Sequence, residues 1–315
     1  MSAAAGNCRR AITYLLCIDH LRGTGLLHPS NRGGIQLGAL RSLVSFYTMF
    51  HMNITQEDMD AMETRFHLTP LVGLIFGFLI IIESTLLIWM FREYGFGSGF
   101  ATAVIVLLTV YAGSKFLHFD GLTDFGDGMI VSGEQSDHIR ALKDTLVGAG
   151  GIGVALITVL CSVAFYAMYN NAPIILLAFP FIEVFVKHAM VVAASIGKPG
   201  NGMAARQVEK TTGRSAILSF GVSIIALIIL MIVSAFVMNQ LYYYDYDFIF
   251  KSTIILIVIG FIVSTIMGAV MARTANRVFG MVNGDILGAT NEISRPFLAF
   301  FLLLAFTLAV EFSVI

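Results

Sequence analysis

Long apolar segments constrain the fold of this chain more than any other feature of its sequence. Each is close to the roughly 20 residues that an α-helix needs to cross the hydrocarbon core of a bilayer. The mean hydropathy of the 315 residues is +0.84, and 57% of them are apolar. The sequence therefore predicts an all-α, polytopic transmembrane helical bundle of about seven spans. These are Pro70–Phe91, Ser98–Phe116, Gly151–Tyr169, Ala172–Ser195, Ala216–Met238, Phe250–Val270 and Pro296–Ile315.

The Lys and Arg residues predict how the bundle is oriented. Of the 19, all but Arg92, Lys187 and Lys251 lie on or next to the segments that would share a side with the N-terminus. Because cytoplasmic loops carry an excess of Lys and Arg, we expect a cytoplasmic N-terminus and an external C-terminus. The predicted location is the plasma membrane, in contact with lipid, with the polar motifs described below on the cytoplasmic face.

The remaining composition excludes two other kinds of protein. A formal net charge of −1 gives no indication of a nucleic-acid partner. Cys8, Cys17 and Cys161 are too scattered for a disulfide framework or a zinc site.

The N-terminal region is predicted to be separate from the membrane domain. Residues 1–36 are expected to form an extension that is flexible or that begins from a misassigned start, and residues 37–315 form the integral membrane domain. Two surface helices are expected before the first span, one at Gln36–Phe50 and an acidic one at Thr55–Glu63.

The segment Phe116–Gly128 carries three aspartates at spacings that suit a metal site. Asp120, Asp124 and Asp127 are four and three residues apart, which places their carboxylates on one helical face. Magnesium would relieve their repulsion, because it takes oxygen ligands and leaves positions open for phosphate oxygens. The alternative is a solvated acidic loop, but the neighbouring Phe and Leu side chains indicate the membrane boundary, where uncompensated charge is costly. His118 is a ligand, a base or an ordinary interfacial histidine.

Two further loops carry polar residues that could complete such a site. Lys143 and Asp144 precede a glycine-rich helix start, whose backbone amides can bind an anion, although glycines also let membrane helices approach. Asp285 and Glu292 are seven residues apart and face the same way on a helix. With Asn291 they complete a metal shell, bind a nucleobase or hydroxyl, or simply begin a solvated helix.

Charged residues also occur inside the predicted spans. Glu183 and Lys187 are four residues apart in the fourth span, and such charges are expected to pair with each other or to line a polar cavity. Lys187 and His188 could also face a cytoplasmic cavity. Glu83, in the first span, has no partner that the sequence identifies.

Taken together, these motifs resemble those of the cobalamin synthase family, the adenosylcobinamide-GDP ribazoletransferases. Residues 118–128 match the family's H-x-D-G-L-x-D-x-x-D-G signature at every fixed position, and residues 284–292 match its G-D-x-L-G-A-x-N-E element. Weaker similarities lie at residues 66–73 and in the K-D-x-x-x-G-x-x-G pattern of residues 143–151. The resemblance extends from about residue 37 to the C-terminus.

The resemblance implies the last joining step of adenosylcobalamin assembly, with magnesium as the cofactor. The adenosylcobinamide-phosphate group of adenosylcobinamide-GDP passes to the 5′-hydroxyl of α-ribazole, or to α-ribazole 5′-phosphate, and GMP leaves. The product is adenosylcobalamin or its 5′-phosphate. Asp120, Asp124 and Asp127 would hold the metal, and a homo-oligomer is compatible with the sequence. The expected catalytic residues are His118, as first candidate for the base, with Lys143, Asp144, Asp285, Asn291 and Glu292.

Two other functions are compatible with parts of the sequence. Membrane phosphotransferases of the CDP-alcohol type also place aspartates at helical spacing around magnesium, but the Ala-Arg of their motif is missing after Asp120-Gly121. A secondary transporter could use Glu83, Glu183 and Lys187, but its ion site is expected at mid-membrane, and the densest acidic cluster here lies at the membrane face.

Overall fold

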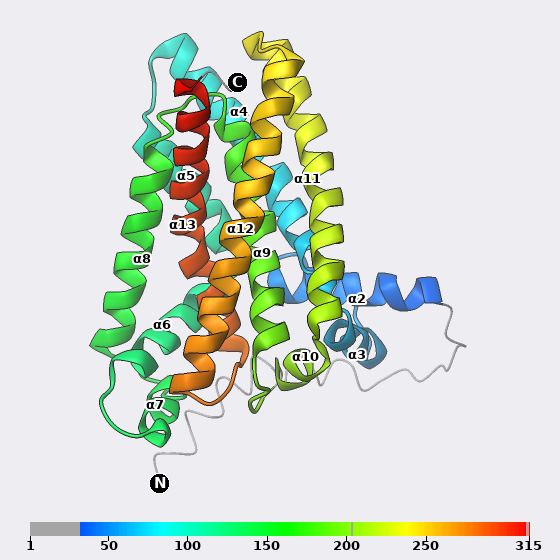
Figure 1. The fold of residues 1–315 in the computed structure, drawn as a ribbon, viewed down its shortest axis with the longest axis vertical. Coiled ribbons are helices and arrows are strands. Elements are labelled where there is room, and N and C mark those ends of the chain that lie inside the picture. Colours follow the sequence, from blue (N-terminus) through cyan, green and yellow to red (C-terminus); the bar gives the residue numbers. More distant parts are fainter. Residues whose placement is uncertain (1–31, 203, 313–314) are drawn as a thin grey trace.

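The computed structural model describes residues 32–202, 204–312 and 315. The extension predicted at residues 1–36 lies outside these residues, except for the first turn of a helix that begins at Arg32. The described residues form helices, and their only β-type pairing is an isolated bridge between Pro199 and Val282. This confirms the predicted all-α bundle (Figure 1).

The helices are numbered in chain order. Before the first long helix come α2 (Arg32–Tyr47), α3 (Gln56–Thr64) and the 3-10 turn η2 (Phe66–Leu68). The rest are α4 (Pro70–Tyr94), α5 (Gly99–Gly113), α6 (Leu117–Ile130), α7 (Gln135–Leu142), α8 (Ala149–Ala167), α9 (Ile175–Ile196), α10 (Ala204–Lys210), α11 (Gly213–Tyr242), α12 (Tyr246–Val278) and α13 (Gly284–Glu311).

Six helices are long and apolar enough to cross a membrane. They are α4, α8, α9, α11, α12 and α13, and the consecutive pair α5 and α6 passes the same test as a broken seventh span. The predicted number of about seven spans is therefore confirmed only if that pair counts as one. The two surface helices are also confirmed as α2 and α3. Thr55 caps α3 by accepting from the Asp58 amide at 3.2 Å, while the Asp58 carboxylate accepts from the Thr55 amide at 3.0 Å.

Helix α9 is the centre of the bundle. Its most apolar stretch of 18 residues is 100% buried inside the protein. In the other five long helices, only 28–44% of the corresponding stretch is buried. It lies against α4, α11, α12 and α13, which surround it in Figure 1. Any charged side chain on α9 must therefore find its partners inside the protein.

The second predicted span is shorter than expected. It ends at Gly113 instead of Phe116, and α6 then leaves at an angle of 93°. Lys115 and Phe116 form the corner in the left-handed region, each with φ near 55°. The acidic segment is consequently a helix that crosses the bundle instead of continuing α5.

The last span is longer than expected. It begins at Gly284 instead of Pro296, and the Asn283 side chain caps it by accepting from the Ile286 amide at 3.1 Å. Glu292 and Arg295 interrupt the apolar run in the sequence, which hides this part of the helix from a hydropathy argument. Inside the fold they form an ion pair, so the helix continues through them.

All the predicted site residues lie at one end of the bundle. Helices α6, α7 and α10 gather there with the first turns of α8 and α13, at the lower end in Figure 1. Only short connections join the spans at the other end. Which end faces the cytoplasm remains a prediction.

Candidate active site

Helix α6 presents its three aspartates along one face, as the sequence predicts. Asp120 is exposed, Asp127 is partly exposed, and Asp124 is buried with 6% of its surface accessible. On its other sides α6 lies against the first turns of α8 and α13. The starts of two helices therefore flank this face, and helix N-termini favour anionic groups.

Asp127 binds the start of α8. Its two carboxylate oxygens accept hydrogen bonds from the backbone amides of Gly148 and Gly151, each at 2.7 Å. These amides belong to the unpaired N–H groups that every helix N-terminus leaves. The glycine-rich segment does bind an anion, as its sequence suggests, but in this structure the anion is the chain's own carboxylate.

Lys143 and Asp144 lie at the outer edge of this region. Both are exposed in the connection between α7 and α8. The Asp144 carboxylate accepts from the Leu146 amide at 3.0 Å, which makes it a local turn residue here. A catalytic contact from either side chain remains a prediction.

Helix α13 approaches α6 closely because both helices carry a glycine at the crossing. A β-carbon at Gly121 would fall 2.7 Å from the Asp285 carbonyl oxygen, and one at Gly288 would fall 3.2 Å from the Cα atom of His118. This places the partly exposed Asp285 beside the aspartates of α6. The Asp285 carboxylate also accepts from the Asn283 side chain at 2.8 Å. We call Asp120, Asp124 and Asp285 the carboxylate rim.

A second cluster of polar residues begins behind the rim, at the start of α6. The buried Lys187 Nζ lies 2.6 Å from His118 Nε2 and 2.8 Å from Asn291 Oδ1. If Lys187 is an ammonium group, which only donates, then His118 Nε2 accepts and Nδ1 carries the proton. The His118 ring stacks on Tyr47 of α2, with centroids 5.4 Å apart. Burial raises the pKa of Tyr47 above its usual value, so the phenol stays protonated at neutral pH.

The same cluster continues along α13. Asn291 Nδ2 donates to Glu292 Oε1 at 2.9 Å, and Arg295 Nε approaches Glu292 Oε2 at 3.5 Å. Arg295 Nη1 donates to Glu183 Oε1 of α9. The Tyr111 and Tyr166 hydroxyl groups are buried without a hydrogen-bond partner in the described part of the chain. We call the six linked side chains the buried network: His118, Lys187, Asn291, Glu292, Arg295 and Glu183.

The structure corrects the expected pairing within the fourth span. Glu183 pairs with Arg295 of another helix, whereas Lys187 bonds to His118 and Asn291. Glu183 and Lys187 are one turn apart on α9, but each bonds to side chains of α6 or α13 and not to the other. Glu83, which had no assigned partner, accepts from the Thr109 hydroxyl at 2.9 Å.

The sequence argument placed Asn291 and Glu292 at the site but missed Arg295. A signal was present, because Arg295 follows Glu292 by three residues and therefore shares its helical face. Its position next to an apolar run made it look like an ordinary charge at a membrane boundary.

The carboxylate rim contains the oxygen donors that could hold magnesium, the cofactor that the sequence predicts. Among the residues that the structure describes, no three His, Cys, Asp or Glu side chains converge to hold a metal ion. Magnesium, however, is usually bound by one or two carboxylates together with substrate phosphates. Asp120 and Asp124, one turn apart on α6, fit that requirement. Asp127 could add a ligand only through lone pairs that the two amides leave free.

Fold and site together define a membrane-type helical bundle with a charge-rich centre at one end. The family model for cobalamin-5-phosphate synthase matches residues 39–305, and the chain belongs to this family. The resemblance inferred from the motifs is thereby confirmed.

Similar proteins named adenosylcobinamide-GDP ribazoletransferase occur in several archaea. One from Methanococcoides burtonii is 28% identical over 282 residues, which cover 85% of this chain and 93% of the relative. One from Methanosarcina mazei is 28% identical over 284 residues, covering 82% and 88%. One from Pyrococcus abyssi is 31% identical over 197 residues, covering 61% and 72%. No solved structure matches the chain.

Proposed function

We propose that this chain transfers the adenosylcobinamide-phosphate group from adenosylcobinamide-GDP to a ribose hydroxyl of α-ribazole or of α-ribazole 5′-phosphate, and releases GMP. Because α-ribazole 5′-phosphate has no free 5′-hydroxyl, the attacking group must be a hydroxyl that both acceptors share. The names of its relatives support these substrate classes. The observation that carries the proposal is the carboxylate rim, which lies beside the first turns of two helices at one end of the bundle. The family match favours this transfer over a CDP-alcohol phosphotransferase or a transporter.

The reaction forms one P–O bond and breaks another. The acceptor hydroxyl oxygen attacks the phosphorus attached to cobinamide, the bond from that phosphorus to the GMP oxygen breaks, and the hydroxyl proton must leave. Such transfers depend mainly on positioning the reactants and on neutralising charge on the phosphate oxygens. Asp120 and Asp124 would hold magnesium, which supplies that neutralisation when bound.

The other rim and edge residues have distinct tasks in this proposal. Asp285 lies beside the aspartates of α6 and would orient the acceptor hydroxyl or accept its proton. Lys143 and Asp144, at the exposed edge, would contact the diphosphate substrate as it enters. His118 could serve as the base only after Lys187 releases its Nε2 atom. Asn291 and Glu292 would act indirectly, as positioning residues that hold Lys187 and Arg295 in place.

The site is proposed to face the cytoplasm from the plasma membrane. Helices α6, α7 and α10 and the first turns of α8 and α13 lie at the end that holds most of the Lys and Arg residues, which is the end that the positive-inside rule assigns to the cytoplasm. Both substrates would then be drawn from the same aqueous compartment.

GMP release by the purified protein tests this function directly. The protein in detergent is given adenosylcobinamide-GDP, α-ribazole and magnesium, with matched samples that contain a chelator or lack α-ribazole. We expect GMP only when both the metal and the acceptor are present. No GMP from folded protein, tested with α-ribazole and with its 5′-phosphate, would contradict the proposal, as would uptake of a substrate without covalent change.

A further inference from the structure

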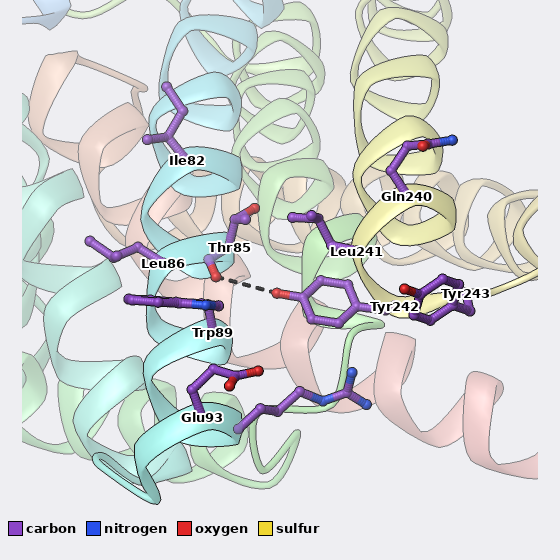
Figure 2. Close-up of a pocket in the computed structure, with 10 residues that line it drawn as sticks. Ile82, Thr85, Leu86, Trp89, Glu93, Gln240, Leu241, Tyr242 and Tyr243 are labelled. Carbon is purple, nitrogen blue, oxygen red and sulfur yellow. Dashed lines mark hydrogen bonds between the residues drawn. The ribbon is translucent and has the colours of Figure 1, made fainter.

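A groove with a polar mouth lies at the end of the bundle opposite the carboxylate rim. It has a volume of about 480 Å³ and runs between the last turns of α4 and α11. Both helices are long and apolar enough to span a membrane, and Ile82, Leu86 and Trp89 in the groove are exposed, so we expect this part of the groove to meet lipid. Figure 2 shows the Tyr242 ring reaching across from α11 to α4, where its hydroxyl donates to the Thr85 carbonyl at 3.3 Å.

The side chains that line the groove change from charged to aromatic to aliphatic along α4. Arg92 and Glu93 line it at the end of the helix, Trp89 follows one turn deeper, and Leu86 and Ile82 continue toward the middle of the span. This order of charged, aromatic and aliphatic side chains matches the headgroup, interface and acyl region of a phospholipid. A ligand that fits the groove must therefore be amphipathic.

The charges at the mouth narrow the choice of headgroup. Arg92 and Glu93 are both exposed, and the Arg92 guanidinium is held over the Tyr242 ring at 4.8 Å from its centroid. Arginine binds phosphate well, and a carboxylate favours an ammonium group that can donate hydrogen bonds. The C-terminal ends of α4 and α11 also lie here, and the helix dipole favours a cation at such an end.

We propose that this groove binds a phospholipid whose headgroup carries a primary amine, as in phosphatidylethanolamine. The phosphate lies at Arg92, the ammonium group lies at Glu93, and the first part of one acyl chain lies along Leu86 and Ile82. A choline headgroup has no N–H to donate, and a glycerol headgroup has no positive charge. Both are therefore bound more weakly.

The sequence provides a probe inside the groove. Trp89 is the only tryptophan of the chain, so its fluorescence reports on this groove alone. The full-length protein is reconstituted into vesicles that mix an unlabelled phosphatidylcholine with a lipid brominated on its acyl chains, which quenches tryptophan on contact. The brominated lipid carries an ethanolamine, choline or glycerol headgroup in three matched series. We expect the ethanolamine lipid to occupy the groove about two- to five-fold more strongly than the other two, the size expected for an exposed ion pair.

Two variants and a matched control test whether Arg92 and Glu93 recognise the headgroup. Glu93→Gln should remove the preference for ethanolamine while general quenching by lipid remains. Arg92→Gln should weaken the binding of all three lipids alike, because all three carry the phosphate. Asp247→Asn alters another exposed acidic residue at the same end, which pairs with Lys251 at 2.7 Å outside this groove, and it should keep the preference.

Equal quenching by the three headgroups would overturn the proposal, and so would an ethanolamine preference that survives in Glu93→Gln. A Trp89 that no brominated lipid quenches would also overturn it, because a protein surface, such as a second copy of the chain, would then cover the groove.

Discussion

The carboxylate rim and the buried network are both charged, but the fold treats them in opposite ways. In the network, Glu183 and Arg295 have completely buried side chains and form an ion pair between α9 and α13. In the rim, Asp120 is exposed, Asp285 is partly exposed, and only Asp124 is buried. Charge buried in a low-dielectric interior is tolerated only when it is paired, and removing one partner is costly. The network is therefore suited to fix helix positions, and the rim to exchange ligands during a reaction.

The largest effect that separates the two regions is expected from the rim. Asp124→Asn keeps the size of the side chain but removes its charge, so turnover should fall by about 10²-fold or more, the loss typical when one group that stabilises transition-state charge is removed. GMP release measures the turnover, and the yield of folded protein in detergent is the control. Turnover like that of the unaltered protein would exclude Asp124 from the metal site.

The buried network should respond in stability instead. Arg295→Met leaves Glu183 and Glu292 buried without their cation, which should lower the free energy of unfolding by about 3–5 kcal/mol. Thermal unfolding in detergent measures this change. The double variant Glu183→Gln/Arg295→Met removes one of the two stranded charges and should be more stable than Arg295→Met alone. If Arg295→Met is as stable as the unaltered protein, the ion pairs do not hold α9 and α13 together.

The glycine crossing joins the two regions, and a matched pair of variants tests it. Gly121→Ala inserts a methyl group against the Asp285 backbone and should cost about 1–3 kcal/mol of stability, as overpacking does. Activity should fall as well, because Asp285 moves away from α6. Gly153→Ala, on α8, meets no atom within 4 Å and should leave both properties unchanged or slightly raise stability. Equal behaviour of the two variants would show that α6 and α13 are not in close contact.

The smallest effect is expected at Asp127. Asp127→Asn can still accept from one of the two glycine amides, so stability should fall by only about 1–2 kcal/mol. If Asp127 serves mainly to hold the start of α8, activity should fall much less than in Asp124→Asn. A loss of GMP release as large as that of Asp124→Asn would instead make Asp127 a metal ligand.

The sequence predicted the features that depend on local patterns. The spans follow from apolar segment length, and the α6 motif was specific enough to indicate the family. The sequence could not show which residues the buried charged side chains pair with. Glu183 and Lys187 share a helical face, yet each binds a residue from a different helix, about 70 to 110 positions away in the chain. The corner at Lys115 and Phe116 was also missed, because it lacks the glycine or proline that usually marks a turn.

The dependence of GMP release on magnesium in Asp120→Asn tests the central claim most directly. Asp120 is exposed and takes no part in the buried network, so the variant should fold normally. We predict that the magnesium concentration for half-maximal GMP release rises by at least about tenfold, since even residues that only support a metal ligand cost 10- to 100-fold in metal affinity. An unchanged magnesium requirement in Asp120→Asn would contradict the assignment of the carboxylate rim as the metal site.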